Sequence, residues 1–183
     1  MENFIKLMAA FGIGFVIVLL VMPKVIPFLH KMKFGQVERE EGLESHKKKG
    51  GTPTMGGVVF VLAAVIAAFV VNYKNIANPN LILITIVLVG YSLIGFVDDA
   101  LIILKHQNEG LKAWQKFLMQ AILAVGCYLY LENFVPGFTT EVTIPVVKVN
   151  IDFGWFYAIL VFIMFTGESN GVNLSYGLDG LAT

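Results

Sequence analysis

Five stretches of the chain are almost entirely apolar, and polar or charged segments separate them. A bilayer core is about 30 Å thick and takes a helix of roughly 20 apolar residues. The pattern therefore predicts an all-α polytopic membrane protein with about five transmembrane helices, the first of which ends at Pro23. The stretches run from about Ile5 to Met22, from Gly56 to Val71, from Leu81 to Val97, from about Phe117 to Leu131 and from Phe153 to Phe165.

The segment between the fourth and fifth stretches has a different pattern. Residues 139–149 are rich in β-branched side chains, with Pro145 near the middle. Such a run, interrupted by a turn residue, favours a small β-hairpin. We expect this hairpin on the outer face of the membrane, and we expect residues 1–183 to form a single transmembrane domain.

The composition narrows the class of protein further. Hydrophobic residues make up 57% of the chain and charged residues 14%, whereas a soluble domain has roughly 45–50% apolar and about 25% charged residues. Thirteen Lys and Arg balance thirteen Asp and Glu. Because nucleic-acid binding needs a strong basic excess, this balance excludes a nucleic-acid partner. The single cysteine, Cys127, excludes an internal disulfide.

Basic residues are distributed unevenly between the polar segments. Residues 23–55 hold seven of the thirteen Lys and Arg, and residues 98–116 hold three more. Cytoplasmic segments of membrane proteins carry such an excess. We therefore predict an N-terminus outside the membrane, with residues 23–55, 98–116 and 166–183 on the cytoplasmic side.

Two adjacent carboxylates, Asp98 and Asp99, directly follow the third apolar stretch. They could be no more than a solvated helix end. The alternative is a divalent-cation site, because Mg²⁺ prefers oxygen ligands and commonly joins one or two carboxylates to substrate phosphates.

Two further segments have the residues of a binding site. Residues 47–57 combine lysines, glycines and hydroxyls before the second stretch. They could bind an anion at a helix N-terminus, or could be a flexible basic loop that touches anionic lipid. Residues 170–182 cluster Asn170, Asn173 and Asp179 with glycines that allow close approach of a flat ligand, or that form a helix-packing face.

Together these motifs resemble a known family, the phospho-N-acetylmuramoyl-pentapeptide transferases of bacteria, commonly called MraY. The resemblance covers essentially the whole chain. Its motifs are Gln36–His46, Lys49 and Gly51–Gly57, then Gly95–Asp99, Lys105, Asn108, Gly110–Leu111 and Gln115–Lys116, and finally Asn170–Ala182.

The resemblance implies a specific reaction. The family transfers phospho-MurNAc-pentapeptide from UDP-MurNAc-pentapeptide to undecaprenyl phosphate, giving lipid I and UMP, the first membrane step of peptidoglycan synthesis. It implies a multi-pass enzyme of the bacterial inner membrane with Mg²⁺ as cofactor, membrane lipid as a partner and a second copy of the chain as a further candidate partner. Asp98 and Asp99 would be catalytic and bind the metal. The substrate-binding residues would be Lys49, Thr52, Thr54, Asn170, Asn173 and Asp179.

The chain departs from the family pattern in three ways. Ile102 stands where the family has a lysine after its aspartate pair, and Tyr176 stands where it has an aspartate. The family also continues through further spans, so the chain resembles its N-terminal portion. We therefore expect that the chain by itself makes no lipid I. The resemblance leaves open whether the reaction takes one step or proceeds through an aspartyl intermediate.

Three other functions compete with this one. Polyprenyl-phosphate GlcNAc-1-phosphate transferases share the aspartate pair, but they usually carry an arginine where this chain has Thr54. A small transporter or channel would need ionisable residues at midplane depth, which the apolar stretches essentially lack. The third is a non-catalytic membrane fragment.

Overall fold

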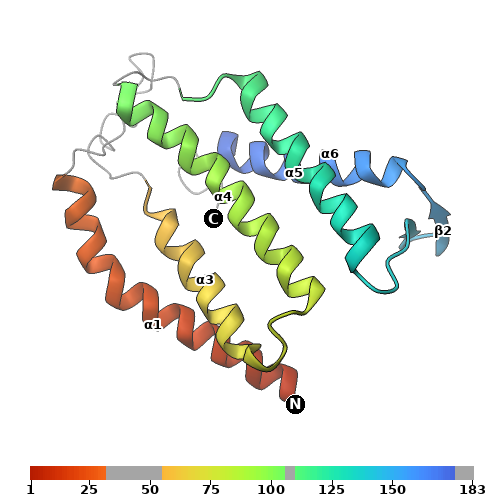
Figure 1. Ribbon diagram of the computed structural model, residues 1–183, viewed down its shortest axis with the longest axis horizontal. Helices are drawn as coiled ribbons and strands as arrows, with labels where there is room; N and C mark the ends of the chain where they lie inside the picture. Colours follow the sequence, from red (N-terminus) through yellow and green to blue (C-terminus); the bar gives the residue numbers. More distant parts are fainter. Residues whose placement is uncertain (32–54, 106–109, 176–183) are drawn as a thin grey trace. The chain divides into compact units, whose positions relative to one another are not determined.

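The computed structural model describes residues 1–31, 55–105 and 110–175, without the side chains of residues 172–175 (Figure 1). The chain divides into two compact units, Met1–Lys112 and Ala113–Thr183. The elements of the first unit are α1 (Glu2–Lys31), α3 (Gly57–Val71), the short 3-10 helix η1 (Tyr73–Asn75) and α4 (Pro79–Lys105). Those of the second are α5 (Ala113–Phe134), β1 (Glu141–Ile144), β2 (Val149–Asp152) and α6 (Phe156–Ser175).

The predicted architecture is confirmed. Each of the five apolar stretches lies largely within a helix, and the β-branched segment forms a two-stranded antiparallel sheet. Within the described residues, three helices are long and apolar enough to cross a membrane, namely α1, α4 and α5, and α3 is a shorter apolar helix. The protein is a helical, polytopic membrane protein.

The predicted end of the first helix at Pro23 is wrong. α1 continues to Lys31 and contains both Pro23 and Pro27. A proline inside a helix removes one backbone hydrogen bond and usually kinks or breaks it. Membrane helices tolerate proline better, because neighbouring groups and local adjustments satisfy the freed carbonyl. The apolar residues between and after the prolines therefore extend the helix.

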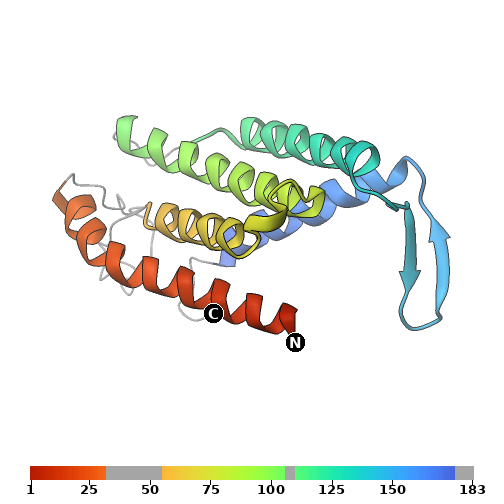
Figure 2. The ribbon, with the colours of Figure 1, turned by 60° about the horizontal axis from the view of Figure 1, so that its bottom comes forward.

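The first unit is built on the packing of α3 between its two neighbours. α1 and α4 both contact α3, and Figure 2 shows α1 and α3 side by side. The buried residues of α3 are Val59, Ala63 and Ala67. Their four-residue spacing places them on one side of the helix. Small side chains there let the neighbouring backbones approach closely, which is how helices associate in lipid.

The start of α4 has a clear local cause. The side-chain Oδ1 of Asn78 accepts hydrogen bonds from the backbone N–H groups of Asn80 (2.9 Å) and Leu81 (3.4 Å). These are amides at the helix N-terminus that have no partner within the helix. Pro79 follows as the first helical residue, where its missing N–H costs nothing. Asn78 and Pro79 together begin the helix that carries the acidic pair.

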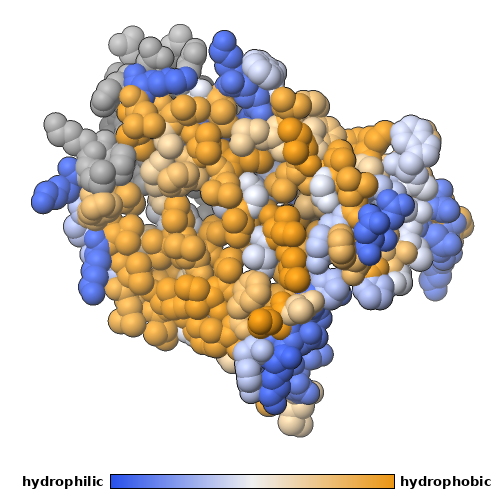
Figure 3. All heavy atoms as spheres, viewed as in Figure 1, coloured by the Kyte–Doolittle hydropathy of each residue, from blue (hydrophilic) through white to orange (hydrophobic). Residues whose placement is uncertain are grey.

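Much of the apolar surface remains outward-facing. Phe11 is 69% exposed and Leu20 is 62% exposed on α1, and Figure 3 shows hydrophobic side chains over most of the visible face of the first unit. Hydrophilic side chains gather near the β-hairpin and at helix ends (Figure 3). An exposed apolar surface of this extent suits hydrocarbon rather than water.

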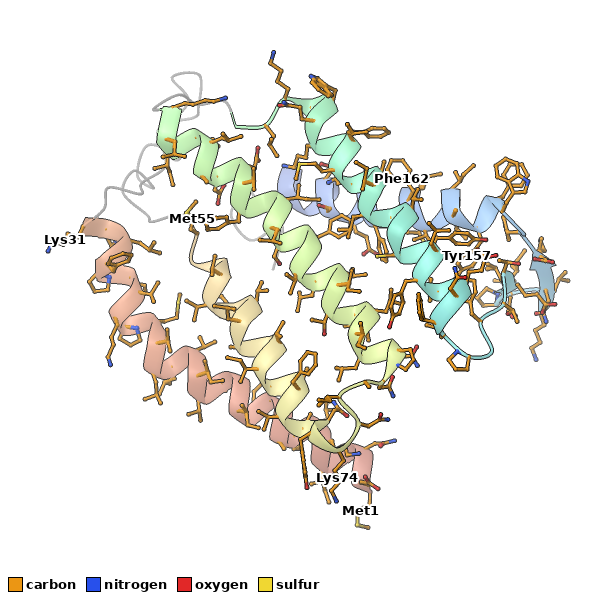
Figure 4. All side chains as sticks on the ribbon, in the orientation of Figure 1. Met1, Lys31, Met55, Lys74, Tyr157 and Phe162 are labelled. Carbon is orange, nitrogen blue, oxygen red and sulfur yellow. The ribbon has the colours of Figure 1, made fainter. Side chains whose placement is uncertain are left out.

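The second unit consists of α5 and α6 packed together, with the hairpin between them in sequence. Phe117 of α5 and Phe162 of α6 meet edge to face, with ring centroids 5.0 Å apart. Near the hairpin, Tyr157 packs against Tyr128 and Phe138 at centroid distances of 6.4 and 5.4 Å. Figure 4 labels Phe162 and Tyr157 on α6. These aromatic contacts join the two helices at separate points along α6.

The hairpin pairs Glu141 with Asp152 and Ile144 with Val149. The Asp152 carboxylate accepts hydrogen bonds from the Thr140 hydroxyl and from the backbone N–H of Gly154, the latter at 2.9 Å. These bonds hold the pKa of Asp152 below its ordinary value of 3.8, the Thr140 hydroxyl having the larger effect.

We predict that Thr140→Val raises the pKa of Asp152 toward 3.8. Because the folded-state pKa is lowered, the carboxylate stabilises the hairpin above pH 3.8, and this contribution is lost as the pH falls through the lowered pKa. A carboxyl ¹³C NMR titration of the chain in micelles measures the shift. Thr143→Val is the control, since it removes only the bond from Thr143 to Asn150. An unchanged Asp152 pKa in Thr140→Val would contradict the assignment.

Candidate functional site

Asp98 and Asp99 lie inside α4, whereas the interpretation as a solvated helix end would place them at its end. α4 continues to Lys105, about two turns beyond the pair. The physical reason is the sequence Ala100–Leu104, whose Ala and Leu residues are strong helix formers. Both aspartates are half-buried. Their side chains are therefore not fully surrounded by solvent.

Asp98 holds a segment that follows α4 in sequence. The backbone N–H of Leu111 donates a hydrogen bond to Oδ1 of Asp98 at 2.7 Å. Gly110 lies so close to Asp98 that an added Cβ would stand 2.8 Å from the Asp98 carbonyl oxygen and would also contact Oδ1. Only glycine allows this approach. The carboxylate and Gly110 together fix residues 110 and 111 against α4.

Oδ1 of the half-buried Asp98 carboxylate is a hydrogen-bond acceptor for Leu111. A hydrogen bond to an ionised carboxylate is stronger than one between neutral groups. This bond fixes the direction of the side chain, which is the property that a ligand-binding carboxylate requires.

The asparagines of the segment 170–182 that the structure describes lie on α6. The helix extends beyond Phe165, where the fifth apolar stretch ends. The helix continues to Ser175 and includes Asn170 and Asn173. The Nδ2 of Asn170 donates hydrogen bonds to the backbone oxygen of Thr166 (2.9 Å) and to Oε1 of Gln120 on α5 (3.1 Å). The side-chain N–H groups of Asn170 thus contact the protein itself.

Gln120 is a polar residue of this cluster that the sequence analysis missed. It is 1% exposed, and its Nε2 donates to the Ser169 hydroxyl at 3.3 Å. Nearby on α6, the Thr166 hydroxyl is buried and has no hydrogen-bond partner among the described residues. A signal for Gln120 did exist, since a polar side chain inside an apolar membrane helix commonly has a role.

Four of the remaining predicted site residues lie outside the described part of the chain, and the fifth has no described side chain. The helix that follows the predicted anion-binding segment begins at Gly57, preceded by Met55 with a left-handed φ of 69°. Asn173 belongs to α6, but its side chain is not described. The structure brings together Asp98 with Gly110 and Leu111 in one unit, and Asn170 with Gln120 in the other. The residues outside the description are Lys49, Thr52, Thr54 and Asp179.

The helices define a polytopic membrane protein, and one of its apolar helices, α4, carries a half-buried carboxylate pair. Residues 81–183 match the model for glycosyl transferase family 4, and residues 49–61 match signature 1 of the phospho-N-acetylmuramoyl-pentapeptide transferases. The family match extends over more than half of the chain. The chain belongs to glycosyl transferase family 4.

Curated relatives agree with this assignment. A phospho-N-acetylmuramoyl-pentapeptide-transferase of Halalkalibacterium halodurans is 45% identical over 170 residues, which are 92% of this chain and 52% of the relative. One of Bacillus subtilis is 44% identical over 169 residues, with the same two coverages. One of Staphylococcus epidermidis is 44% identical over 173 residues, with coverages of 93% and 54%. The chain spans about half the length of the curated relatives it matches.

We predict that Gly110→Ala breaks the contact between Asp98 and Leu111. The added methyl group would collide with the Asp98 carboxylate and carbonyl, so the local free energy of unfolding should fall by about 1–3 kcal/mol. Faster hydrogen exchange at the Leu111 amide measures the loss.

Gly95→Ala is the matched control on α4, because an added Cβ there meets nothing within 4 Å. Alanine in a helix is favoured over glycine by roughly 0.5–1 kcal/mol, so this variant should exchange no faster than the original chain. Equal exchange at Leu111 in both variants would show that Gly110 is not required by the contact.

Proposed function

We propose that the chain supplies part of the active site of a transferase that moves phospho-MurNAc-pentapeptide from UDP-MurNAc-pentapeptide to undecaprenyl phosphate. The observation that carries the proposal is the half-buried Asp98–Asp99 pair on an apolar helix. It occurs in a chain that also matches the family model and the signature of the phospho-N-acetylmuramoyl-pentapeptide transferases. Relatives that are 44–45% identical carry that name.

The donor set of the pair fits Mg²⁺. Mg²⁺ prefers oxygen ligands and usually keeps waters and substrate phosphates beside one or two carboxylates. Two adjacent carboxylates on one helix are the ligand type and number that such a site needs from the protein. Asp98 and Asp99 would hold the ion. When bound, it would neutralise the charge of the pyrophosphate.

The proposed reaction exchanges one phosphorus–oxygen bond for another. An oxygen of the lipid phosphate bonds to the phosphorus that carries the sugar, and the bond from that phosphorus to the departing UMP breaks. The chain's own task is to position these groups and to offset their charge. A carboxylate of the aspartate pair would accept a proton from the lipid phosphate. Lys49, Thr52 and Thr54 would bind phosphate oxygens.

The nucleotide would be bound by the other predicted residues. Asn170, Asn173 and Asp179 would contact the UDP part of the substrate, and glycines in that segment would leave room for the flat base. Since both acceptors recorded for the Asn170 amide nitrogen are protein oxygens, we infer that Asn170 contacts the nucleotide through its carbonyl oxygen.

We predict that Asp99→Asn lowers turnover by about 100-fold or more, because a neutral amide neither binds a cation nor accepts a proton as a carboxylate does. Asp98→Asn should act similarly while keeping the Leu111 bond, since the amide oxygen remains an acceptor. For the assay, the chain is fused to the part of the Bacillus subtilis relative that lies outside the matched region. UMP release is followed with both substrates and Mg²⁺.

Two further measurements complete this assay. Asp152→Asn changes a hairpin carboxylate and should leave turnover unchanged. UDP-GlcNAc replaces the muramoyl substrate in a parallel reaction, and preferential use of it would favour the related GlcNAc-1-phosphate transfer. Full turnover of both aspartate variants would exclude the pair from the reaction.

We also propose that the protein lies in the bacterial inner membrane with its N-terminus outside and its basic segments in the cytoplasm, as the distribution of Lys and Arg indicates. With Cys127 replaced, single cysteines at Ser45 and Thr140 are treated with an impermeant thiol reagent in intact cells. We expect labelling at Thr140 and protection at Ser45. The reverse result would overturn the orientation.

A further inference from the structure

A buried side-chain amide on α5, that of Gln120, bonds a half-buried one on α6, that of Asn170. Gln120 is 1% exposed and lies on the same face of α5 as the buried Ala124 and Cys127. The two helices pack together, and Figure 1 shows them crossing. Gln120 contacts Ser169 and Asn170 of α6. An apolar side chain would fill this position without needing a hydrogen-bond partner. Glutamine instead restricts the orientation of the polar side chains that it bonds.

The hydrogen bonds have a direction. The Gln120 Nε2 donates to the Ser169 hydroxyl at 3.3 Å, which turns its Oε1 toward α6 as an acceptor. That oxygen accepts a hydrogen bond from the Asn170 Nδ2 at 3.1 Å. The same nitrogen also donates to the Thr166 backbone oxygen at 2.9 Å. An amide nitrogen has two hydrogens, so both donors of Asn170 are in use.

The consequence for Asn170 is chemical. A freely rotating asparagine can present either its N–H₂ group or its carbonyl oxygen to a ligand. With the nitrogen held by Gln120 and Thr166, the carbonyl oxygen is the atom that remains for a ligand. Within the described part of the chain, no hydrogen bond to that oxygen is recorded. The ligand group that it suits is an N–H or O–H donor.

We propose that Gln120 is a positioning residue that fixes the side-chain amide of Asn170, so that Asn170 meets its ligand only as a hydrogen-bond acceptor. The identity of the ligand, the nucleotide carrier of the sugar, rests on the proposed function. The orientation of the amide does not. Gln120 acts through Asn170 and touches no reacting atom.

Nuclear magnetic resonance of the full chain tests the orientation without any activity. The chain is labelled with ¹⁵N-asparagine in micelles, and Asn170→Leu identifies the side-chain resonances by their disappearance. Gln120→Met introduces an apolar side chain that is also unbranched and of similar length, and it removes the acceptor. We expect the Asn170 amide resonances to shift and their hydrogen exchange to become faster. Unchanged resonances in Gln120→Met would overturn the proposal.

Two variants complete this experiment. Gln120→Glu retains an oxygen acceptor for Asn170 and should restore slow exchange of the side-chain amide. Cys127→Ala is the matched control, because it also alters a buried residue on the same face of α5 but has no recorded contact with Asn170. If Cys127→Ala disturbs the Asn170 resonances as strongly as Gln120→Met, general helix packing is responsible and the proposal is wrong.

Kinetics of the joined protein test the consequence. In Gln120→Met we expect the KM for the nucleotide substrate to rise about tenfold, while kcat and the KM for undecaprenyl phosphate stay within about twofold. A purely structural role would instead lower the melting temperature and affect all three constants together. Without turnover in the joined protein with Gln120 intact, the proposed function fails. The resonances of Asn170 still decide the positioning proposal in that case.

Discussion

The structure depends on one constraint, which is the free-energy cost of leaving a polar group in an apolar helix without a hydrogen-bond partner. Hydrocarbon contains no water, and an unsatisfied group costs several kcal/mol. Asp98 therefore accepts the Leu111 amide, and Gln120 is bonded to residues of α6. In both cases the polar side chain bonds the segment that packs opposite to it. A few such contacts fix the packing of the segments in each unit, whereas apolar side chains are tolerant of sliding.

The positions of the helices could be predicted from the sequence, but several of their ends could not. Apolar stretches report the part of a helix that suits lipid, whereas the helix continues for as long as its backbone bonds are favourable. α4 continues beyond Val97 and α6 beyond Phe165 for this reason. Pro23 is a different case. Proline usually ends a helix in a soluble protein, but a membrane helix can continue through it. The hairpin was predicted because β-branched residues surround a turn within a short segment.

Residues of the candidate site could be proposed from the sequence, but the contacts that they make could not. Asp98 and Asp99 stand out because charge is rare beside apolar stretches. Asn170 stands out for its polar neighbours. Its partner Gln120 is fifty residues away, and no spacing rule relates positions on two different helices. The same holds for Gly110, whose requirement follows from the approach of Asp98 and not from any local turn. The site roles of Asp98, Asp99 and Asn170 stay predictions, as do those of Lys49, Thr52, Thr54, Asn173 and Asp179.

Charged and neutral polar groups are placed differently in the two units, and the difference follows from the cost of burial. Moving an ionised carboxylate out of water costs far more than moving an amide. The carboxylates of Asp98 and Asp99 are accordingly only half-buried, while the amide of Gln120 is almost completely buried. Groups that keep contact with water can exchange it for an ionic ligand. A fully buried amide has no water to exchange, and it can instead orient a neighbouring side chain, as Gln120 does for Asn170. In the proposed reaction, charge is therefore handled by the aspartates and orientation by the amides.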